Sequence, residues 1–137
     1  MRITTKGRYG LRAVLVLAIE EDEKPVPIRY IAEKENLSPE FLEQIFFRLK
    51  KAGIIFSTRG AGGGFKLNKR PEEITILEIM TAVGEDINLS PCDTPKDSPC
   101  DRIDTCKTTA LWQNGTNMMR DYFASITLSD AMADCVK

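Results

Sequence analysis

Apolar residues recur every three or four positions through the first fifty residues, a spacing that predicts three consecutive helices. Thr4 or Thr5 can cap the first helix, and a short second helix spans residues 28–36. The third begins at Ser38, a favourable N-cap, with Pro39 at the first helical position. The apolar positions are Tyr9, Ala13, Val14, Leu17 and Ala18 in the first helix, Ile28, Ile31 and Ala32 in the second, and Leu42, Ile45, Phe46 and Leu49 in the third.

The pattern then changes to two short apolar runs, residues 54–56 and 65–67, on either side of the glycine-dense loop 59–64. Short apolar runs around such a loop predict a β-hairpin with a flexible tip. Thr75 and Glu78 fit a capping box, which predicts a fourth helix that ends near Gly84.

The C-terminal third contains a loop and a long helix. Residues 85–106 include three prolines and little apolar content, which predicts a loop, and a helix then runs from Thr108 to about Ser125. Thr127 and Asp130 cap a last short helix. We expect the long helix to form a homodimer, because a domain this small cannot bury its broad apolar face alone. That face contains Leu111, Met118, Met119, Tyr122 and Ile126.

These elements predict a mainly α-helical fold with a small β-hairpin. We divide it into a winged helix-turn-helix at residues 1–84, a cysteine-rich loop at 85–107, and a dimerisation helix with a C-terminal arm at 108–137. The longest apolar stretch is too short to span a bilayer, and the N-terminus lacks an apolar signal core. We therefore expect a cytoplasmic protein without a membrane partner.

Charge is distributed unevenly along the chain, although the net charge is only -1. Residues 1–70 hold fourteen Lys and Arg against eight Asp and Glu, whereas residues 71–137 hold five against twelve. A basic N-terminal half favours a polyanionic partner, and the helix-turn-helix pattern identifies that partner as double-stranded DNA.

Polar side chains off the apolar stripe of the third helix are the candidate base-reading residues. Gln pairs with adenine edges, Glu accepts from cytosine N4, and Ser bonds a base or a phosphate. We expect the N-terminal half of this helix, with Ser38, Glu40, Glu43 and Gln44, to enter the major groove. Phe47 falls opposite the stripe, and we favour packing against the first helix over a base contact as its role.

Basic and glycine residues complete the predicted interface. Arg48, Lys50 and Lys51 are expected phosphate contacts, and Arg59 at the hairpin is suited to a narrow minor groove. Gly60 and Gly62 leave no side chains to block close approach of the nucleic acid backbone. The alternative is that the charged helix face is ordinary solvated surface and the glycine loop only a hairpin.

Three cysteines, Cys92, Cys100 and Cys106, have the spacing C-x7-C-x5-C within the loop. Clustered thiols in a reducing compartment are more often metal ligands or redox groups than a disulfide framework. They are the usual ligands of iron–sulfur clusters and zinc, and the absence of a C-x2-C pair disfavours a zinc ribbon. Free cysteines in a disordered loop are the alternative. Cys135 lies apart, near the C-terminus, and we expect it to be a spectator.

An ordered set of motifs resembles the Rrf family of bacterial winged-helix regulators, over essentially the whole chain. The resemblance rests on Thr5-Lys6-Gly7-Arg8-Tyr9-Gly10, Leu42-Glu43-Gln44-Ile45-Phe46, Arg59-Gly60-Ala61-Gly62-Gly63-Gly64-Phe65, the three cysteines, Ala110-Leu111-Trp112 and Ile126-Thr127-Leu128. It implies a homodimeric regulator, chiefly a repressor, that binds palindromic or pseudo-palindromic promoter DNA, senses iron–sulfur cluster status and controls cluster assembly genes. It also implies that the three cysteines bind the cluster, with 2Fe-2S favoured over 4Fe-4S, that Glu43 links cluster state to DNA preference, and that Arg59 is the wing arginine.

The chain departs from that family at the fourth cluster ligand. Cluster-binding members carry a histidine three residues after the last cysteine, where this chain has Thr109, and nitric-oxide-sensing members draw an aspartate from the partner's first helix, where it has Arg8. The interval between the first two cysteines is also longer than is usual in the family.

Two other readings stay open. A nitric-oxide or iron-responsive repressor would use the same scaffold, whereas an iron–sulfur carrier would have no use for a base-reading helix. We do not expect an enzyme or a small-molecule substrate, because the sequence has no histidine, no phosphate-binding glycine loop before a helix and no carboxylate pair on a shared face.

Overall fold

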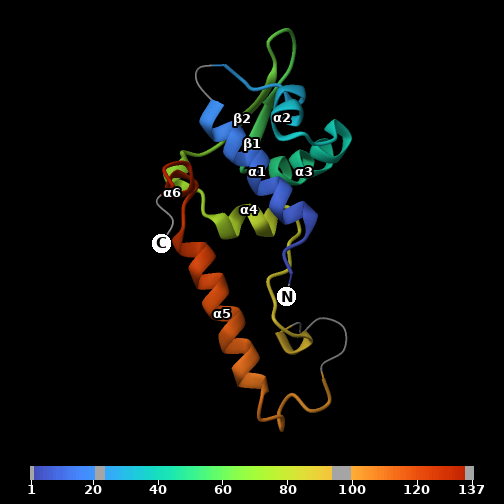
Figure 1. Cartoon of the computed structure of the whole chain (residues 1–137), viewed down its shortest axis with the longest axis vertical. Helices are drawn as coiled ribbons and strands as arrows, with labels where there is room; N and C mark the ends of the chain where they lie inside the picture. Colours follow the sequence, from blue (N-terminus) through green and yellow to red (C-terminus); the bar gives the residue numbers. More distant parts are fainter. Residues whose placement is uncertain (1, 21–23, 94–99, 135–137) are drawn as a thin grey trace.

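A computed structural model of the chain describes residues 2–20, 24–93 and 100–134. Three helices, α1 (Thr5–Glu20), α2 (Ile28–Glu35) and α3 (Pro39–Lys51), form the head of the molecule with a β-hairpin (Figure 1). α2 ends at Asn36, whose φ of 53° is in the left-handed region, and the chain turns directly into α3. The Ser38 hydroxyl accepts a hydrogen bond from the Phe41 amide at 3.3 Å, which confirms the predicted N-cap.

The hairpin pairs β1 (Ile55–Thr58) with β2 (Gly64–Leu67) in antiparallel register. Val26 pairs with β2 as an isolated β-bridge, because its amide and carbonyl exchange hydrogen bonds of 2.9 Å with the backbone of Phe65. A Cβ at Gly64 would collide with that backbone, so the strand must have glycine there. The hairpin is thereby tied to the segment between α1 and α2.

The core of the head is built from the predicted apolar stripes. Leu42, Ile45, Phe46 and Leu49 of α3 are all at most 1% exposed, and the Phe46 ring makes an edge-on contact with Phe65 at 4.9 Å between centroids. α1 packs against α2, α3 and β2, which places it at the centre of the head. The sequence prediction of a mainly helical winged helix-turn-helix is confirmed.

Beyond the hairpin follow α4 (Ile76–Ala82), α5 (Thr109–Ser125) and α6 (Leu128–Met132), with 3-10 turns at Pro71–Glu73 and Pro91–Asp93. Capping boxes begin α4 and α6 as predicted, from Thr75 with Glu78 and from Thr127 with Asp130. α5 extends away from the head, and only its C-terminal end is joined to it (Figure 1). That junction combines packing of α5 against α4 with a bridge between Thr75 and Thr127, where the Ile76 amide donates to the Ile126 carbonyl at 2.9 Å.

The start of α1 is capped by a carboxylate from a distant part of the chain. Glu85, only 8% exposed, accepts hydrogen bonds from the Thr4 amide at 3.1 Å and the Thr4 hydroxyl at 2.5 Å. The Gly7 amide donates in turn to the Thr4 hydroxyl at 3.4 Å. In an ordinary capping box, the third residue after the N-cap supplies the carboxylate from its own side chain. Here that residue is Gly7, and a Cβ on it would collide with the Glu85 carboxylate.

In the ranges described above, no helix combines the length and the apolar character needed to cross a membrane.

Candidate nucleic-acid interface and cysteine loop

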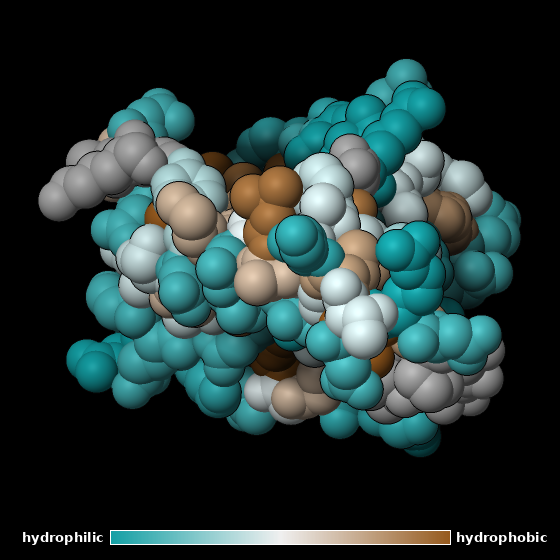
Figure 2. Space-filling view, turned by 90° about the horizontal axis from the view of Figure 1, so that it is seen from below, coloured by the Kyte–Doolittle hydropathy of each residue, from teal (hydrophilic) through white to brown (hydrophobic). Residues whose placement is uncertain are grey.

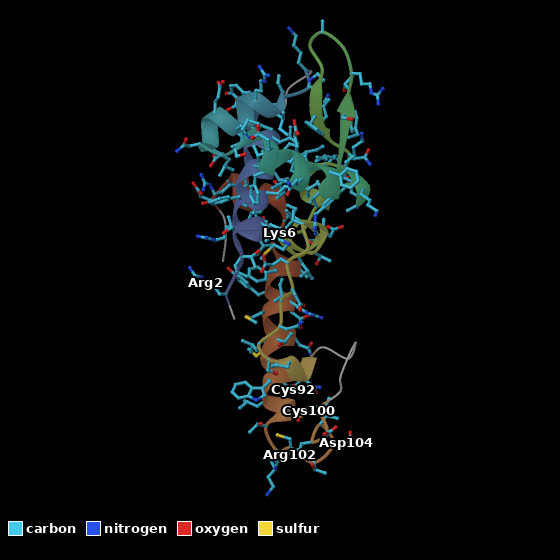
Figure 3. All side chains as sticks on the ribbon, turned by 90° about the vertical axis from the view of Figure 1, so that its right-hand side faces the viewer. Arg2, Lys6, Cys92, Cys100, Arg102 and Asp104 are labelled. Carbon is cyan, nitrogen blue, oxygen red and sulfur yellow. The ribbon has the colours of Figure 1, made fainter. Side chains whose placement is uncertain are left out.

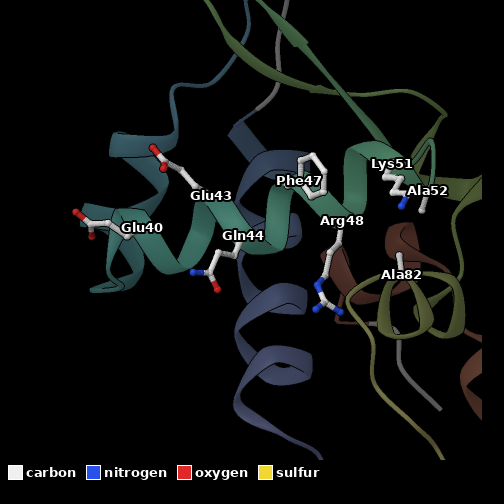
Figure 4. Close-up of a pocket in the computed structure, with 8 residues that line it drawn as sticks. All are labelled: Glu40, Glu43, Gln44, Phe47, Arg48, Lys51, Ala52 and Ala82. Atoms are coloured by element: carbon white, nitrogen blue, oxygen red, sulfur yellow. The ribbon is translucent and has the colours of Figure 1, made fainter.

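The outward face of α3 carries the predicted base-reading residues. Glu40, Glu43 and Gln44 are exposed and follow one another at helical spacing, toward Phe47 one turn later (Figure 4). These side chains line a hollow together with Arg48, Lys51, Ala52 and, from α4, Ala82. The outward face of α3 therefore carries exposed polar side chains and one aromatic ring, beside a hollow that α4 also lines.

Ser38 and Glu40 are bonded to each other at the helix N-terminus. The Ser38 hydroxyl donates to the Glu40 carboxylate at 2.8 Å while it caps the helix. The backbone amide of Glu40, and then the Ser38 hydroxyl, lower the pKa of the Glu40 carboxyl below its usual range. Both residues thus stabilise the start of α3, in addition to any contact they make with DNA.

Phe47 does not pack against α1, so that prediction is wrong. Its side chain is 69% exposed, whereas the adjacent Phe46 is fully buried in the core. Consecutive residues on a helix differ by about 100° in direction, so two neighbouring aromatic residues end on opposite sides. Phe47 lies on the same face as the base-reading residues.

The basic residues predicted to contact DNA differ in whether their side chains are hydrogen-bonded within the protein. Arg48 reaches toward α4, where its guanidinium donates to the Val83 carbonyl at 3.4 Å. Lys50 donates to the Ser57 hydroxyl of β1 at 2.8 Å and so ties α3 to the hairpin. Arg59 is exposed at the hairpin tip, next to Gly60 and Gly62, whose φ angles of 96° and 77° favour glycine. The tip therefore depends on glycine for its path as well as for its lack of side chains.

The cysteine loop lies at the far end of α5 from the head. Cys92 belongs to the 3-10 turn that packs against α5, and Cys106 lies three residues before that helix begins. Figure 3 shows Cys92 and Cys100 at this end of the molecule, with Arg102 and Asp104 of the same loop. Within the described ranges, no three His, Cys, Asp or Glu side chains come together as a ligand set. Cys135 lies outside the described residues.

Cys106 has the chemistry of a thiolate ligand. Its sulfur lies 3.2 Å from the Thr108 hydroxyl, and that hydrogen bond is the main reason that the pKa of the Cys106 thiol is lowered to about 7. A large share of the thiol is then ionised near neutral pH, which is the form that binds iron. The Thr109 hydroxyl, at the position of the family's histidine, donates to the Ile103 carbonyl at 3.2 Å and closes the turn. The donors fit a thiolate-bound cluster in kind.

The predicted apolar face of α5 divides into two parts. Met119 is half-buried and Ile126 is buried, both in a second small core with Ile76 and Met80 of α4. Leu111, Trp112, Met118 and Tyr122 are exposed, with Met118 at 73%. Figure 2, viewed from below, shows hydrophobic side chains reaching the surface among hydrophilic ones. The exposed part is the remaining candidate for an interface with a second copy.

The capping role of Glu85 was not predicted from the sequence, and the environment predicted for Phe47 was wrong. No local motif marks Glu85, because its partner lies 81 residues earlier in the chain. The signal that was available is the pair of glycines, Gly7 and Gly10, inside the first helix. Glycine weakens a helix interior, so its presence there indicates close packing of another group. A Cβ at Gly10 would stand only 3.0 Å from Val83, two residues before Glu85.

A capped helix with an open polar face, a glycine-tipped hairpin beside it and basic residues on both define a winged helix-turn-helix DNA-binding protein. Residues 3–134 match the Rrf2 family model, described as an iron-dependent transcriptional regulator, and the chain belongs to this family. The resemblance seen in the sequence is confirmed.

Relatives within the family include regulators of two kinds, IscR and CymR. The chain is 38% identical over 130 residues to the HTH-type transcriptional regulator IscR of Photorhabdus laumondii, covering 95% of this chain and 78% of that protein. The structure of IscR from T. potens has a TM-score of 0.78 at 32% identity, covering 98% of this chain and 88% of that one. The structure of CymR, the global cysteine regulator of B. subtilis, also has a TM-score of 0.78 at 32% identity, covering 97% of both chains. The chain is a DNA-binding transcriptional regulator of the IscR type.

Proposed function

We propose that the chain is a homodimeric repressor that senses iron–sulfur cluster status and controls cluster assembly genes. The observation that carries this proposal is the three-cysteine loop at the end of α5, in a chain whose relatives include IscR. The proposed organisation is a DNA-binding head at residues 1–84, a cluster-binding loop at 85–107 and a dimerisation arm at 108–137.

The proposed DNA contacts lie on α3 and the hairpin. Glu43 and Gln44 read base edges, with Ser38 and Glu40 at the start of the helix and Arg48 and Lys50 near its end. Arg59 enters the minor groove from the hairpin, where Gly60 and Gly62 allow close approach. In a two-fold dimer, the second head supplies the same contacts one helical turn of DNA or a multiple of it away.

Cys92, Cys100 and Cys106 are the proposed cluster ligands, with 2Fe-2S favoured over 4Fe-4S. When bound, the cluster would cross-link these thiolates, and that cross-link would be lost on oxidation or iron shortage. The chain itself prepares Cys106 as a thiolate through Thr108, the N-cap residue of α5. A nitric-oxide or iron-responsive repressor is the alternative within this proposal: it would use the same scaffold and the same cysteines but respond to a different signal.

A regulator of cysteine metabolism that uses no cluster is the second candidate. It is supported by the structural similarity to CymR, the global cysteine regulator. The two candidates share the DNA-binding head and differ in what the cysteine loop detects.

Anaerobic purification separates the two candidates. We expect the protein to contain iron and acid-labile sulfide, to absorb visible light, and to give a Mössbauer spectrum that identifies the cluster. Alanine at Cys92, Cys100 or Cys106 should abolish the absorption, and Cys135→Ala is the matched control that should retain it. A colourless, iron-free protein after anaerobic reconstitution would reject the cluster and leave the second candidate.

A further inference from the structure

Phe47 is the apolar side chain on the outward face of α3 that the proposed contacts leave without a role. It is 69% exposed, although an equally large aromatic residue directly before it fills the core. An exposed apolar residue by itself is ordinary. The position of this one is informative, because it lies one turn after Glu43 and Gln44 and one turn before Lys51, on the face that we propose enters the major groove (Figure 4).

The major groove offers one apolar group, the 5-methyl group of thymine, and apolar side chains, phenylalanine included, recognise it. We infer that Phe47 is a specificity-determining residue that contacts a thymine methyl group in each half-site, beside the bases read by Glu43 and Gln44. This inference rests on the proposed function of α3 as the recognition helix. It assigns a base preference to a residue that makes no hydrogen bond.

The surroundings of Phe47 favour DNA over a protein partner. The hollow beside it is lined by charged and polar side chains, with Arg48 and Lys51 on the C-terminal side. The last turn of α3 holds three cations, which favours a polyanion. A stable protein–protein interface has an apolar core of several residues, and a single ring among charged groups is too small to form one. A thymine methyl group, in contrast, can be covered by one aromatic ring.

Ala52 and Ala82 make the approach of a duplex sterically possible. These small residues line the hollow next to Phe47, and Ala82 is the residue that α4 contributes to this lining. The buried stripe on the opposite side of α3 fixes the helix, and the Phe47 backbone is therefore held in place by Phe46 and Leu49.

The test uses full-length protein and a random duplex library, from which the wild-type protein enriches its preferred sites. Each thymine of an enriched duplex is then replaced by deoxyuridine, which removes the 5-methyl group and keeps every hydrogen-bonding atom. We expect one replacement per half-site to weaken wild-type binding about fourfold, the factor for burial of one methyl group. Phe47→Ala should bind the thymine and deoxyuridine duplexes equally.

Two further variants control this experiment. Ile19→Ala removes an exposed apolar side chain from the last turn of α1 and should retain the wild-type response to deoxyuridine. Phe47→Leu keeps an apolar side chain on α3 and should retain part of the loss of affinity that deoxyuridine causes in the wild type. Because Phe47 is exposed, its variants should unfold at the same temperature as the wild type, as followed by circular dichroism.

Each other outcome overturns the inference. If Phe47→Ala responds to deoxyuridine as the wild type does, another residue contacts the methyl group. If no replacement affects the wild type, or if Phe47→Ala changes only the sedimentation of the protein, the ring contacts no thymine. A wild-type protein that enriches no duplex rejects the DNA-binding role of α3 itself, which is distinguishable from the failure of Phe47 alone.

Discussion

The carboxylate of Glu85 and the missing side chain of Gly7 should be energetically coupled. Glu85 supplies the carboxylate that the third residue of α1 supplies in an ordinary capping box, and a Cβ on that residue, Gly7, would displace it. Gly7→Ala should therefore have opposite effects on stability, depending on whether Glu85 is present.

The magnitude follows from the hydrogen bonds. Hydrogen bonds to a charged group contribute about 1.5–3 kcal/mol each, and Glu85 accepts from two donors of Thr4, at 3.1 Å and 2.5 Å. Thr4 is itself exposed, so water replaces a part of this interaction, and we expect Glu85→Ala to cost about 2 kcal/mol. Alanine is about 1 kcal/mol better than glycine in a helix. Gly7→Ala should then destabilise the wild type by about 1 kcal/mol and stabilise the Glu85→Ala protein by about the same amount.

Urea unfolding of the four proteins, followed by circular dichroism at one fixed protein concentration, measures this cycle. Asp86→Ala is the matched control, because it removes the neighbouring exposed carboxylate. Equal effects of Gly7→Ala in both backgrounds, within about 0.5 kcal/mol, would show that the two residues are independent and that the capping argument is wrong.

Three further predictions concern the wing, the dimer and acid stability. Arg59→Ala should weaken DNA binding by about 1–3 kcal/mol and reduce its salt dependence, measured by fluorescence anisotropy at several salt concentrations; unchanged affinity would remove the wing from the interface. Met118→Glu should convert the proposed dimer to a monomer in sedimentation velocity, whereas Asn117→Glu on the adjacent face should not; a dimeric Met118→Glu would place the interface elsewhere. The hydrogen bond from the Thr75 amide lowers the pKa of Glu78 from its ordinary value of 4.5. The ionised Glu78 cap therefore stabilises the fold above pH 4.5, and this stabilisation is lost as the pH falls through the lower pKa of the folded state. Glu78→Gln should flatten the loss of thermal stability in that acidic range, and an unchanged pH profile would count against the cap.

Local structure could be predicted because its causes lie close together in the sequence. Ser38, Thr75 and Thr127 each accept a hydrogen bond from an amide three residues later, so a short motif identifies each cap. The buried stripe of α3 follows from helical spacing alone. These elements, in their order, were sufficient to predict the winged helix-turn-helix fold.

Features that join distant residues could not be predicted in this way. Helical spacing places Phe47 off the buried stripe but does not show whether α1 reaches it. The same spacing groups Met118 with Met119 on one face of α5, and only the position of α4 shows that Met119 faces the second core while Met118 is exposed. The cap formed by Glu85 depends on a return of the chain to its own beginning, which no periodicity describes.

The bridge between Thr75 and Thr127 helps to set the angle between α5 and the head. In a dimer built on α5, this angle would determine how the two recognition helices are placed relative to each other. α5 has 17 residues, which corresponds to a length of about 25 Å at the usual rise per residue. In a dimer built on α5, a tilt of about 8° at the bridge displaces the opposite end by about 3.4 Å, the rise of one base pair. In such a dimer, a change of a few degrees at this junction would therefore couple a displacement of the cysteine-loop end of α5, on the scale of one base-pair rise, to the orientation of the head.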